Sequence, residues 1–355
     1  MKRKTVMSGM RATGRLHLGN LWGALKRWVA IQDEYQCYFM VADWHMLTTA
    51  YDRTEGLGAS VREMVLDWLA AGLDPKKCVI FLQSRVPEHA ELYLLLSMIT
   101  PLSWLENNPT WKEQLQELSK TKHGLALGLQ APEAPSGEAD ESLRTHGFLG
   151  YPVLQAADIL IYDADLVPVG QDQLPHLELS REIARRFNTI YGKGGEVLCE
   201  PRAMPTEIPK LLGTDGRKMS KSYGNAIDIF EEPDTLRKKV MGMYTDPTKV
   251  RANDPGHPDP CPENPPGCSV CALQKLYNPD WKTRVEDCRA GRTGCVACKK
   301  ELLSLLEKPF AEFRARRAAY DAKAVDSILA EGSARAREKA GATLDRLRRA
   351  MRLVS

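Results

Sequence analysis

The sequence contains no apolar run long enough to cross a membrane, and Met1–Lys4 lead directly into a strand-like segment without an apolar leader. We therefore expect a cytoplasmic protein with no membrane partner. Both glycine-rich nucleotide signatures, GxxxxGK(S/T) and GxGxxG, are also missing. Their absence excludes a P-loop enzyme and a standard dinucleotide dehydrogenase.

The chain has little net charge, because its 49 Lys and Arg residues nearly balance its 46 Asp and Glu residues over 355 positions. Hydrophobic residues make up 43% and charged residues 27%, which is ordinary for a soluble globular protein of one or two domains. The basic residues are concentrated near the end, where residues 314–352 hold eleven Lys and Arg against five Asp and Glu. This pattern indicates a polyanionic partner such as RNA.

Apolar strands alternate with amphipathic helices through the first two thirds of the chain, which is typical of a parallel α/β sheet. We expect strands at 5–8, 37–41, 78–82 and 166–169, and helices at 20–35, 60–71, 88–99, 111–120 and 174–187. We expect a Rossmann-type domain over 1–224 with an insertion at about 124–147, a mostly helical domain over 225–320, and a final helix over 321–355.

Residues 150–173 bring several polar side chains into an otherwise apolar unit. Tyr151-Pro152 predicts a helix start, because proline suits the first helical position. Asp158 lies inside the apolar run that follows, and Gln173 comes just after the strand at 166–169. Ligands of α/β sheets bind beyond the carboxyl ends of the strands, so we interpret this stretch as one wall of a small-ligand pocket.

Two further motifs are suited to binding phosphate. His17 and Asn20 lie three residues apart at a predicted helix start, and Gly19 between them allows a ligand to approach the backbone. The second motif, Gly216-Arg-Lys-Met-Ser-Lys-Ser222, places Lys218 and Lys221 three residues apart in a polar loop. We interpret this loop as a cationic clamp for a polyphosphate.

The order of these motifs resembles the class I aminoacyl-tRNA synthetases. The amino-acid sequence of residues 150–173 is similar to that of the bacterial tryptophanyl-tRNA synthetases in particular. The resemblance implies a homodimer that uses Mg²⁺ and ATP to convert L-tryptophan into tryptophanyl-adenylate and pyrophosphate. The tryptophan then passes to tRNA(Trp), and the helical domain would bind the anticodon.

The resemblance also implies roles for individual residues. His17, Asn20, Lys218 and Lys221 would be catalytic. Tryptophan would contact His45, Tyr151, Gln155, Asp158 and Gln173, with Asp158 accepting the indole N–H. ATP would contact Gly9, Arg11, Thr13, Gly14, His17, Gly19, Asn20, Gly170, Gln171, Asp172, Lys218, Met219, Ser220, Lys221 and Ser222. Arg11 departs from the glutamine common in the family, and Gln155 from the methionine.

Six of the nine cysteines fall between residues 261 and 298 and repeat the pattern C-x6-C-x2-C. This clustering favours a metal site over disulfides. A zinc site would use Cys268, Cys271, Cys295 and Cys298. Some relatives carry a 4Fe–4S cluster on similar spacing, so we favour a cluster on Cys268, Cys288, Cys295 and Cys298, with Cys261 and Cys271 as alternatives.

Two other functions compete with the tryptophan–tRNA ligase. A tyrosyl-tRNA synthetase would share the fold and the helix predicted to start at Tyr151, but the amino-acid sequence of residues 167–173 argues against this alternative. The other is a synthetase-like, metal-dependent regulatory or redox-sensing protein that binds nucleotide or RNA, but such a protein would have no use for the intact phosphate-binding motifs.

Overall fold

Five parallel strands form one sheet in the order β3-β2-β1-β4-β5 in the computed structural model, which describes residues 3–108, 145–170, 173–205 and 211–353. The strands are β1 (Thr5–Arg11), β2 (Gln36–Ala42), β3 (Val79–Leu82), β4 (Leu166–Val169) and β5 (Arg202–Pro205). The chain order reverses between β1 and β4, so the sheet has the topological switch point at which α/β proteins bind ligands. The predicted α/β fold with a parallel sheet is confirmed.

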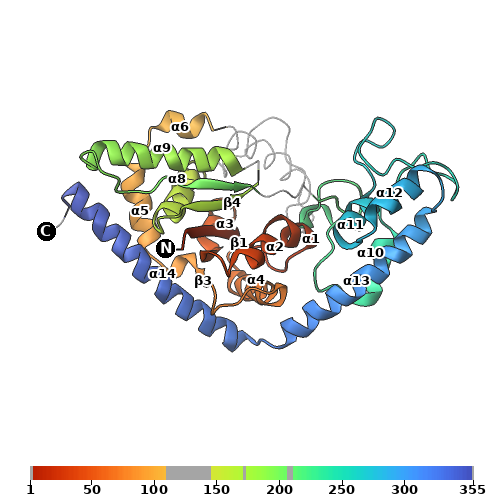
Figure 1. The fold of residues 1–355 in the computed structure, drawn as a ribbon. Coiled ribbons are helices and arrows are strands. Elements are labelled where there is room, and N and C mark those ends of the chain that lie inside the picture. The colour runs from red at the N-terminus through yellow and green to blue at the C-terminus, as the bar shows by residue number, and fades with distance from the viewer. Residues whose placement is uncertain (1–2, 109–144, 171–172, 206–210, 354–355) are drawn as a thin grey trace. The chain divides into compact units, whose positions relative to one another are not determined.

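Helices cover both faces of this sheet (Figure 1). Successive residues of a strand point to opposite faces. Phe39 therefore stacks on Trp28 of α2 (Lys26–Ile31), with ring centroids 4.6 Å apart, while its neighbour Tyr38 stacks on Tyr162, just after α8 (His146–Leu160), at 4.7 Å. Trp68 of α4 (Leu57–Ala71) meets the same Trp28 edge-on. These large, fully or almost fully buried rings fix the helices on the sheet.

The chain divides into two compact units. The first consists of Met1–Gly14, Arg27–Glu207 and Tyr320–Ser355, and the second of Arg15–Lys26 and Ile208–Ala319. Besides the sheet, α2, α4 and α8, the first unit has α3 (Asp43–Ala50), η2 (Gln83–Arg85), α5 (Glu88–Ser97), α6 (Leu102–Glu106), α9 (Leu174–Tyr191) and α14 (Ala322–Met351). The second is mostly helical, with α1 (Leu18–Asn20), η1 (Leu21–Leu25), η5 (Lys221–Tyr223), α10 (Pro233–Met241), α11 (Ser269–Tyr277), α12 (Trp281–Arg289) and α13 (Cys295–Ala318). In the described part of the chain, no helix is both long and apolar enough to cross a membrane.

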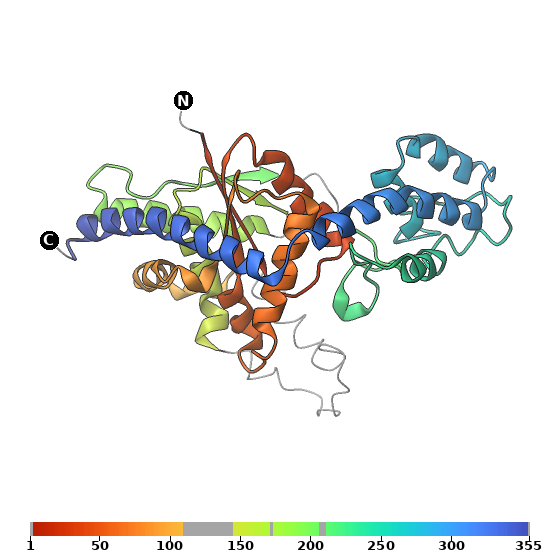
Figure 2. The same cartoon turned by 90° about the horizontal axis from the view of Figure 1, so that it is seen from below.

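Helix α14 covers the outer edge of the sheet at β3 (Figure 1, Figure 2). The approach is so close that a Cβ added at Gly332 would lie 1.8 Å from the carbonyl oxygen of Ile80. The next residue, Ser333, accepts a hydrogen bond from the backbone N–H of Leu82 at 3.3 Å. A sheet edge left open is a site for aggregation, so this helix protects β3 as well as burying its own apolar face.

Several boundaries differ from the predicted ones. Helix α8 begins at His146 and not at Tyr151, because Thr145 caps it by accepting from the N–H of Phe148, which leaves Pro152 inside the helix. The predicted helix over 20–35 begins at Leu18, passes through the π-helical turn η1 and ends at Ile31. Strand β5 and helix α3 were not predicted. The predicted helix at 111–120 and residues 124–144 of the insertion lie outside the described residues.

Candidate active site

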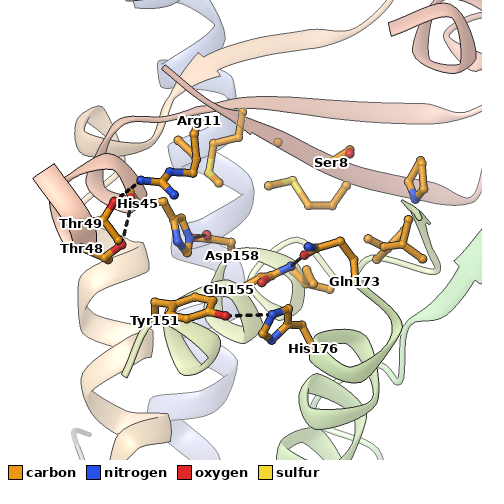
Figure 3. Close-up of a pocket in the computed structure, with 18 residues that line it drawn as sticks. Ser8, Arg11, His45, Thr48, Thr49, Tyr151, Gln155, Asp158, Gln173 and His176 are labelled. Atoms are coloured by element: carbon orange, nitrogen blue, oxygen red, sulfur yellow. Dashed lines mark hydrogen bonds and ion pairs between the residues drawn. The ribbon is translucent and has the colours of Figure 1, made fainter. Parts of the chain in front are cut away.

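A cavity of about 260 Å³ opens at the carboxyl ends of β1, β2 and β4, on the switch-point side of the sheet (Figure 3). Seven predicted site residues line it: Gly9, Arg11, His45, Tyr151, Gln155, Asp158 and Gln173. They come from β1, α3, α8 and the start of α9, so the parallel topology brings together residues that are up to 164 positions apart. The cavity is close to the lower end of the range for small-ligand pockets, roughly 300 Å³.

Asp158 is the buried acid of this cavity, with 2% of its surface exposed. Burial alone would raise the pKa of its carboxyl group, but hydrogen bonds from His45 and His89 outweigh that effect and lower the pKa below its usual value. Asp158 is therefore ionised at neutral pH and acts only as a hydrogen-bond acceptor. An acceptor of this kind suits a ligand that presents an N–H or O–H donor to the cavity wall.

Other polar groups of the cavity lie in two hydrogen-bonded pairs. The hydroxyl of Tyr151 lies 3.0 Å from Nε2 of His176, and burial raises the pKa of this phenol, so it is neutral. Gln155 Nε2 donates to Oε1 of Gln173 at 3.4 Å. These groups can hold an amino group, which needs acceptors around it.

Arg11 lies at the end of β1, and its guanidinium donates to the hydroxyl of Thr49 on α3 (Figure 3). A guanidinium in a ligand cavity can bind a carboxylate or a phosphate through two parallel hydrogen bonds. Sequence reasoning did not single out Thr49 and several other lining residues, although Ile159 and residues 167–169 belong to the stretch that it interpreted as one wall of the pocket. The missed residues are Met7, Ser8, Met40, Ala42, Thr48, Thr49, Ile159, Val167, Pro168, Val169 and His176.

Three predicted ATP-contacting residues in the first unit, Thr13, Gly14 and Gly170, are described but are not among the residues that line this cavity. Gln171 and Asp172 lie outside the described residues. Their predicted contacts with ATP stay predictions.

His17 and Asn20 organise the start of α1 in the second unit. Nδ1 of His17 accepts from the N–H of Gly19 at 3.1 Å, and the side chain of Asn20 accepts from the N–H of His17 at 3.2 Å. A Cβ at Gly19 would lie 2.8 Å from the imidazole, so this capping arrangement requires glycine. The N–H of Leu18 donates to the carbonyl of Ile227 at 2.9 Å and that of Ile229 to the carbonyl of Leu16 at 3.2 Å, which ties this helix start to the segment that follows the 216–222 loop.

Asn225 organises the cationic loop, and sequence reasoning missed it. Its carboxamide accepts from the N–H of Ser220 at 2.8 Å and donates to the carbonyl of Lys218 at 3.1 Å and to Asp215 at 2.7 Å. Met219 is buried, whereas Lys218 and Lys221 are exposed. The loop therefore presents two ammonium groups from a hydrogen-bonded base.

The loop acts electrostatically on His17. Burial, followed by the positive charges of Lys221 and Lys218, lowers the pKa of this imidazole to about 4. His17 is therefore neutral at physiological pH and can donate or accept a hydrogen bond beside two cations. The structure thus brings together the four predicted catalytic residues, His17, Asn20, Lys218 and Lys221, within one unit.

A second cavity, in the helical unit, is lined by five of the six clustered cysteines. Arg284, Thr245 and Thr293 also face it. Among the described residues, no group of three or more His, Cys, Asp or Glu side chains is arranged to hold a metal ion. The five cysteines are Cys268, Cys271, Cys288, Cys295 and Cys298, so Cys261 is the one that does not line the cavity.

Known proteins match the chain over nearly its whole length. The family described as "tRNA synthetases class I (W and Y)" matches residues 1–311. The chain belongs to this family. It is 46% identical to the tryptophan–tRNA ligase of Aquifex aeolicus and 46% identical to that of Thermotoga maritima, each alignment covering 98% of this chain and 99% of the relative.

Solved structures agree with this family assignment. The tryptophanyl-tRNA synthetase of Campylobacter jejuni, complexed with ADP and tryptophan, superposes with a TM-score of 0.77. It is 32% identical and covers 98% of this chain and 99% of its own. The predicted class I synthetase family is confirmed. The tyrosine-activating alternative is the weaker one, because the relatives that are 46% identical are tryptophan–tRNA ligases.

Proposed function

We propose that this chain is a tryptophan–tRNA ligase. The carboxylate of L-tryptophan attacks the α-phosphorus of ATP, pyrophosphate leaves, and tryptophanyl-adenylate then esterifies the terminal ribose of tRNA(Trp). The observation that carries this proposal is the ionised, buried carboxylate of Asp158, a hydrogen-bond acceptor in the wall of a cavity at the carboxyl ends of the strands. The relatives of the same family support it.

In this reaction Asp158 accepts the indole N–H, while Tyr151 and Gln173 hold the amino group and His45 and Gln155 line the pocket. Phenylalanine has no N–H to donate to Asp158, so it would bind without the hydrogen bond to the charged carboxylate, which is worth roughly ten- to hundredfold in affinity. Arg11 faces the same cavity, and we assign it to the substrate carboxylate or the α-phosphate.

Activation by ATP requires positioning and charge stabilisation and no protein nucleophile. His17, Asn20, Lys218 and Lys221 supply hydrogen bonds and positive charge for the phosphates. Mg²⁺ bound to ATP would neutralise further phosphate charge. Adenosine and its ribose would contact Gly9, Thr13, Gly14, Gly19, Gly170, Gln171 and Asp172, and the loop residues Met219, Ser220 and Ser222 would complete the phosphate site.

The test is ATP–pyrophosphate exchange with tryptophan, tyrosine or phenylalanine, followed by charging of tRNA(Trp). We expect exchange with tryptophan alone and charging of this tRNA. Exchange with tyrosine would mean that Asp158 accepts a hydrogen bond from the phenol hydroxyl of a tyrosine substrate. A folded, metal-replete protein without exchange would support the regulatory alternative.

We propose that the cysteine cavity holds a 4Fe–4S cluster. Its support is that five cysteines line one cavity, including Cys288, Cys295 and Cys298 with their x6 and x2 spacing; cluster binding would require the cysteine side chains to move from their present arrangement, which forms no metal-binding group among the described residues. Burial raises the pKa of Cys268 to about 11 and that of Cys298 to about 12, so these thiols are protonated in the metal-free chain and cluster assembly would release protons.

Iron, sulfide and zinc analysis of anaerobically purified protein tests this assignment, together with a visible spectrum. Iron with equal sulfide supports the cluster, whereas one zinc and no iron supports the tetrahedral alternative. Cys295→Ser should lower the metal content. Cys37→Ser, a buried strand cysteine in the other unit, is the matched control and should not.

We also propose a homodimer that works in the cytoplasm. Leu94 in α5, Met98 directly after α5 and Leu102 at the start of α6 are 53%, 69% and 64% exposed, three large apolar side chains that a second copy of the chain could bury. Light scattering after size exclusion should give twice the chain mass of 39.7 kDa, and Met98→Glu should shift it towards the monomer.

A further inference from the structure

The carboxylate of Asp158 already accepts hydrogen bonds from three side chains on three different elements. His89 of α5 donates from Nδ1 to Oδ1 at 2.5 Å, and His45 of α3 donates from Nε2 to Oδ2 at 2.7 Å. Gln83 of η2 donates from Nε2 to both oxygens, at 2.9 and 3.0 Å. A carboxylate has about four lone-pair positions, and these contacts occupy all of them.

The three donors differ in their access to the cavity. His89 and Gln83 are fully buried, and neither lines it. The side chain of His45 is 12% exposed and does line the cavity. A ligand N–H arriving from the cavity can therefore replace His45 and cannot reach the other two donors.

A second hydrogen bond fixes the role of His89. Its Nε2 lies 2.7 Å from the hydroxyl of Tyr162, which is itself fully buried and stacked on Tyr38. Because the carboxylate requires a proton on Nδ1, Nε2 of the neutral ring is left to accept from the Tyr162 hydroxyl. The tautomer follows from the partners on both sides.

We propose that His89 is a positioning residue for tryptophan selectivity. With Gln83 it holds Asp158 in place from behind, while His45 is the exchangeable donor whose position the indole N–H takes. This inference rests on the proposed function, in which Asp158 accepts the indole N–H. Losing His89 would leave an oxygen of Asp158 and the hydroxyl of Tyr162 without their shared partner, so the carboxylate would no longer be aligned with the ligand.

The experiment measures dissociation constants by calorimetry for two ligands that differ at one atom. One ligand is tryptophan, and the other is its analogue in which sulfur replaces the indole N–H. For His89→Leu we expect tryptophan affinity to fall roughly ten- to hundredfold, the value of a hydrogen bond to a charged group, with little change for the analogue. A general structural defect would instead weaken both ligands alike and would overturn the proposal.

Further variants keep the test decisive. The His89→Asn variant, whose amide nitrogen can replace Nδ1 as a donor, should recover much of the affinity for tryptophan and serves if His89→Leu does not fold. His45→Ala should lose less affinity than His89→Leu, and an equal loss would refute the exchangeable role. Asp158→Asn separates the two hypotheses: if it leaves the preference for tryptophan over the analogue unchanged, the proposed pocket itself is wrong. If Asp158→Asn removes that preference and His89→Leu does not, only the role of His89 fails.

Discussion

Two glycines of the same helix predict opposite effects of one substitution. In α14, a Cβ at Gly341 would meet no heavy atom within 4 Å, whereas a Cβ at Gly332 would lie 1.8 Å from the carbonyl oxygen and 2.8 Å from the carbonyl carbon of Ile80. Gly341→Ala should therefore stabilise the chain by the helix-propensity difference alone, about 0.5–1 kcal/mol. Gly332→Ala receives the same gain but must push α14 away from β3.

The size of the second effect follows from what the methyl group meets. A backbone carbonyl inside a paired strand cannot rotate aside, so the helix must move by about 1 Å or more, and overpacking of this kind costs typically 1–3 kcal/mol. That movement also stretches the 3.3 Å hydrogen bond from Leu82 to Ser333. Because both variants receive the same propensity gain, they should differ by the overpacking cost alone, roughly 1–3 kcal/mol.

Urea unfolding followed by circular dichroism measures this difference. With an m-value of about 3 kcal/mol/M, the midpoints of the two variants should lie roughly 0.3–1 M apart, with Gly332→Ala below the unsubstituted chain and Gly341→Ala above it. Equal midpoints, or stabilisation by both substitutions, would show that α14 does not seat on β3 as described.

Three further predictions concern the phosphate-binding unit. Lys221→Ala should slow ATP–pyrophosphate exchange by roughly 10²–10³-fold, as removal of one transition-state donor does, with little change in the dissociation constant of tryptophan; comparable losses in both would refute the clamp. The imidazole of His17 should titrate near pH 4 by NMR and move towards 6.5 in Lys221→Ala, because one of the neighbouring charges is gone; a wild-type value near 6.5 would contradict its burial beside two cations. Asn225→Ala removes the hydrogen bonds that shape the loop and should raise the KM for ATP more than the KM for tryptophan, as steady-state exchange kinetics can show.

The sequence was most informative where local pattern and tertiary role coincide. The strand at Leu166–Val169 has the predicted bounds, because a short apolar run is bounded by turn residues on both sides. Strand β5 was missed because its four residues, Arg202–Pro205, show neither alternation nor β-branched side chains. The start of α8 was misplaced because proline was taken as the first helical residue, although Thr145 offered a capping hydroxyl six residues before Tyr151.

In the candidate site, too, some residues could be predicted from the local sequence and others could not. Asp158 was found because a carboxylate inside an apolar helix has no local explanation. His89 and Gln83 were not found, since each lies in an unremarkable segment and acquires its meaning only when α5 and η2 pack beside α8. Long-range hydrogen bonds of this kind depend on the topology and leave no periodic signal in the sequence.

Selectivity and phosphate chemistry are built from separate hydrogen-bond networks. The cited hydrogen-bond partners of Asp158 all lie in the unit that holds the sheet. Those of His17 and of the 216–222 loop lie in the helical unit. A substitution in one network leaves the hydrogen bonds of the other intact, and effects at such independent sites usually add. Under the proposed roles, tryptophan recognition can be altered at His89 without disturbing the lysines that we propose to stabilise the departing pyrophosphate. The selectivity of this ligase can change while its reaction stays the same.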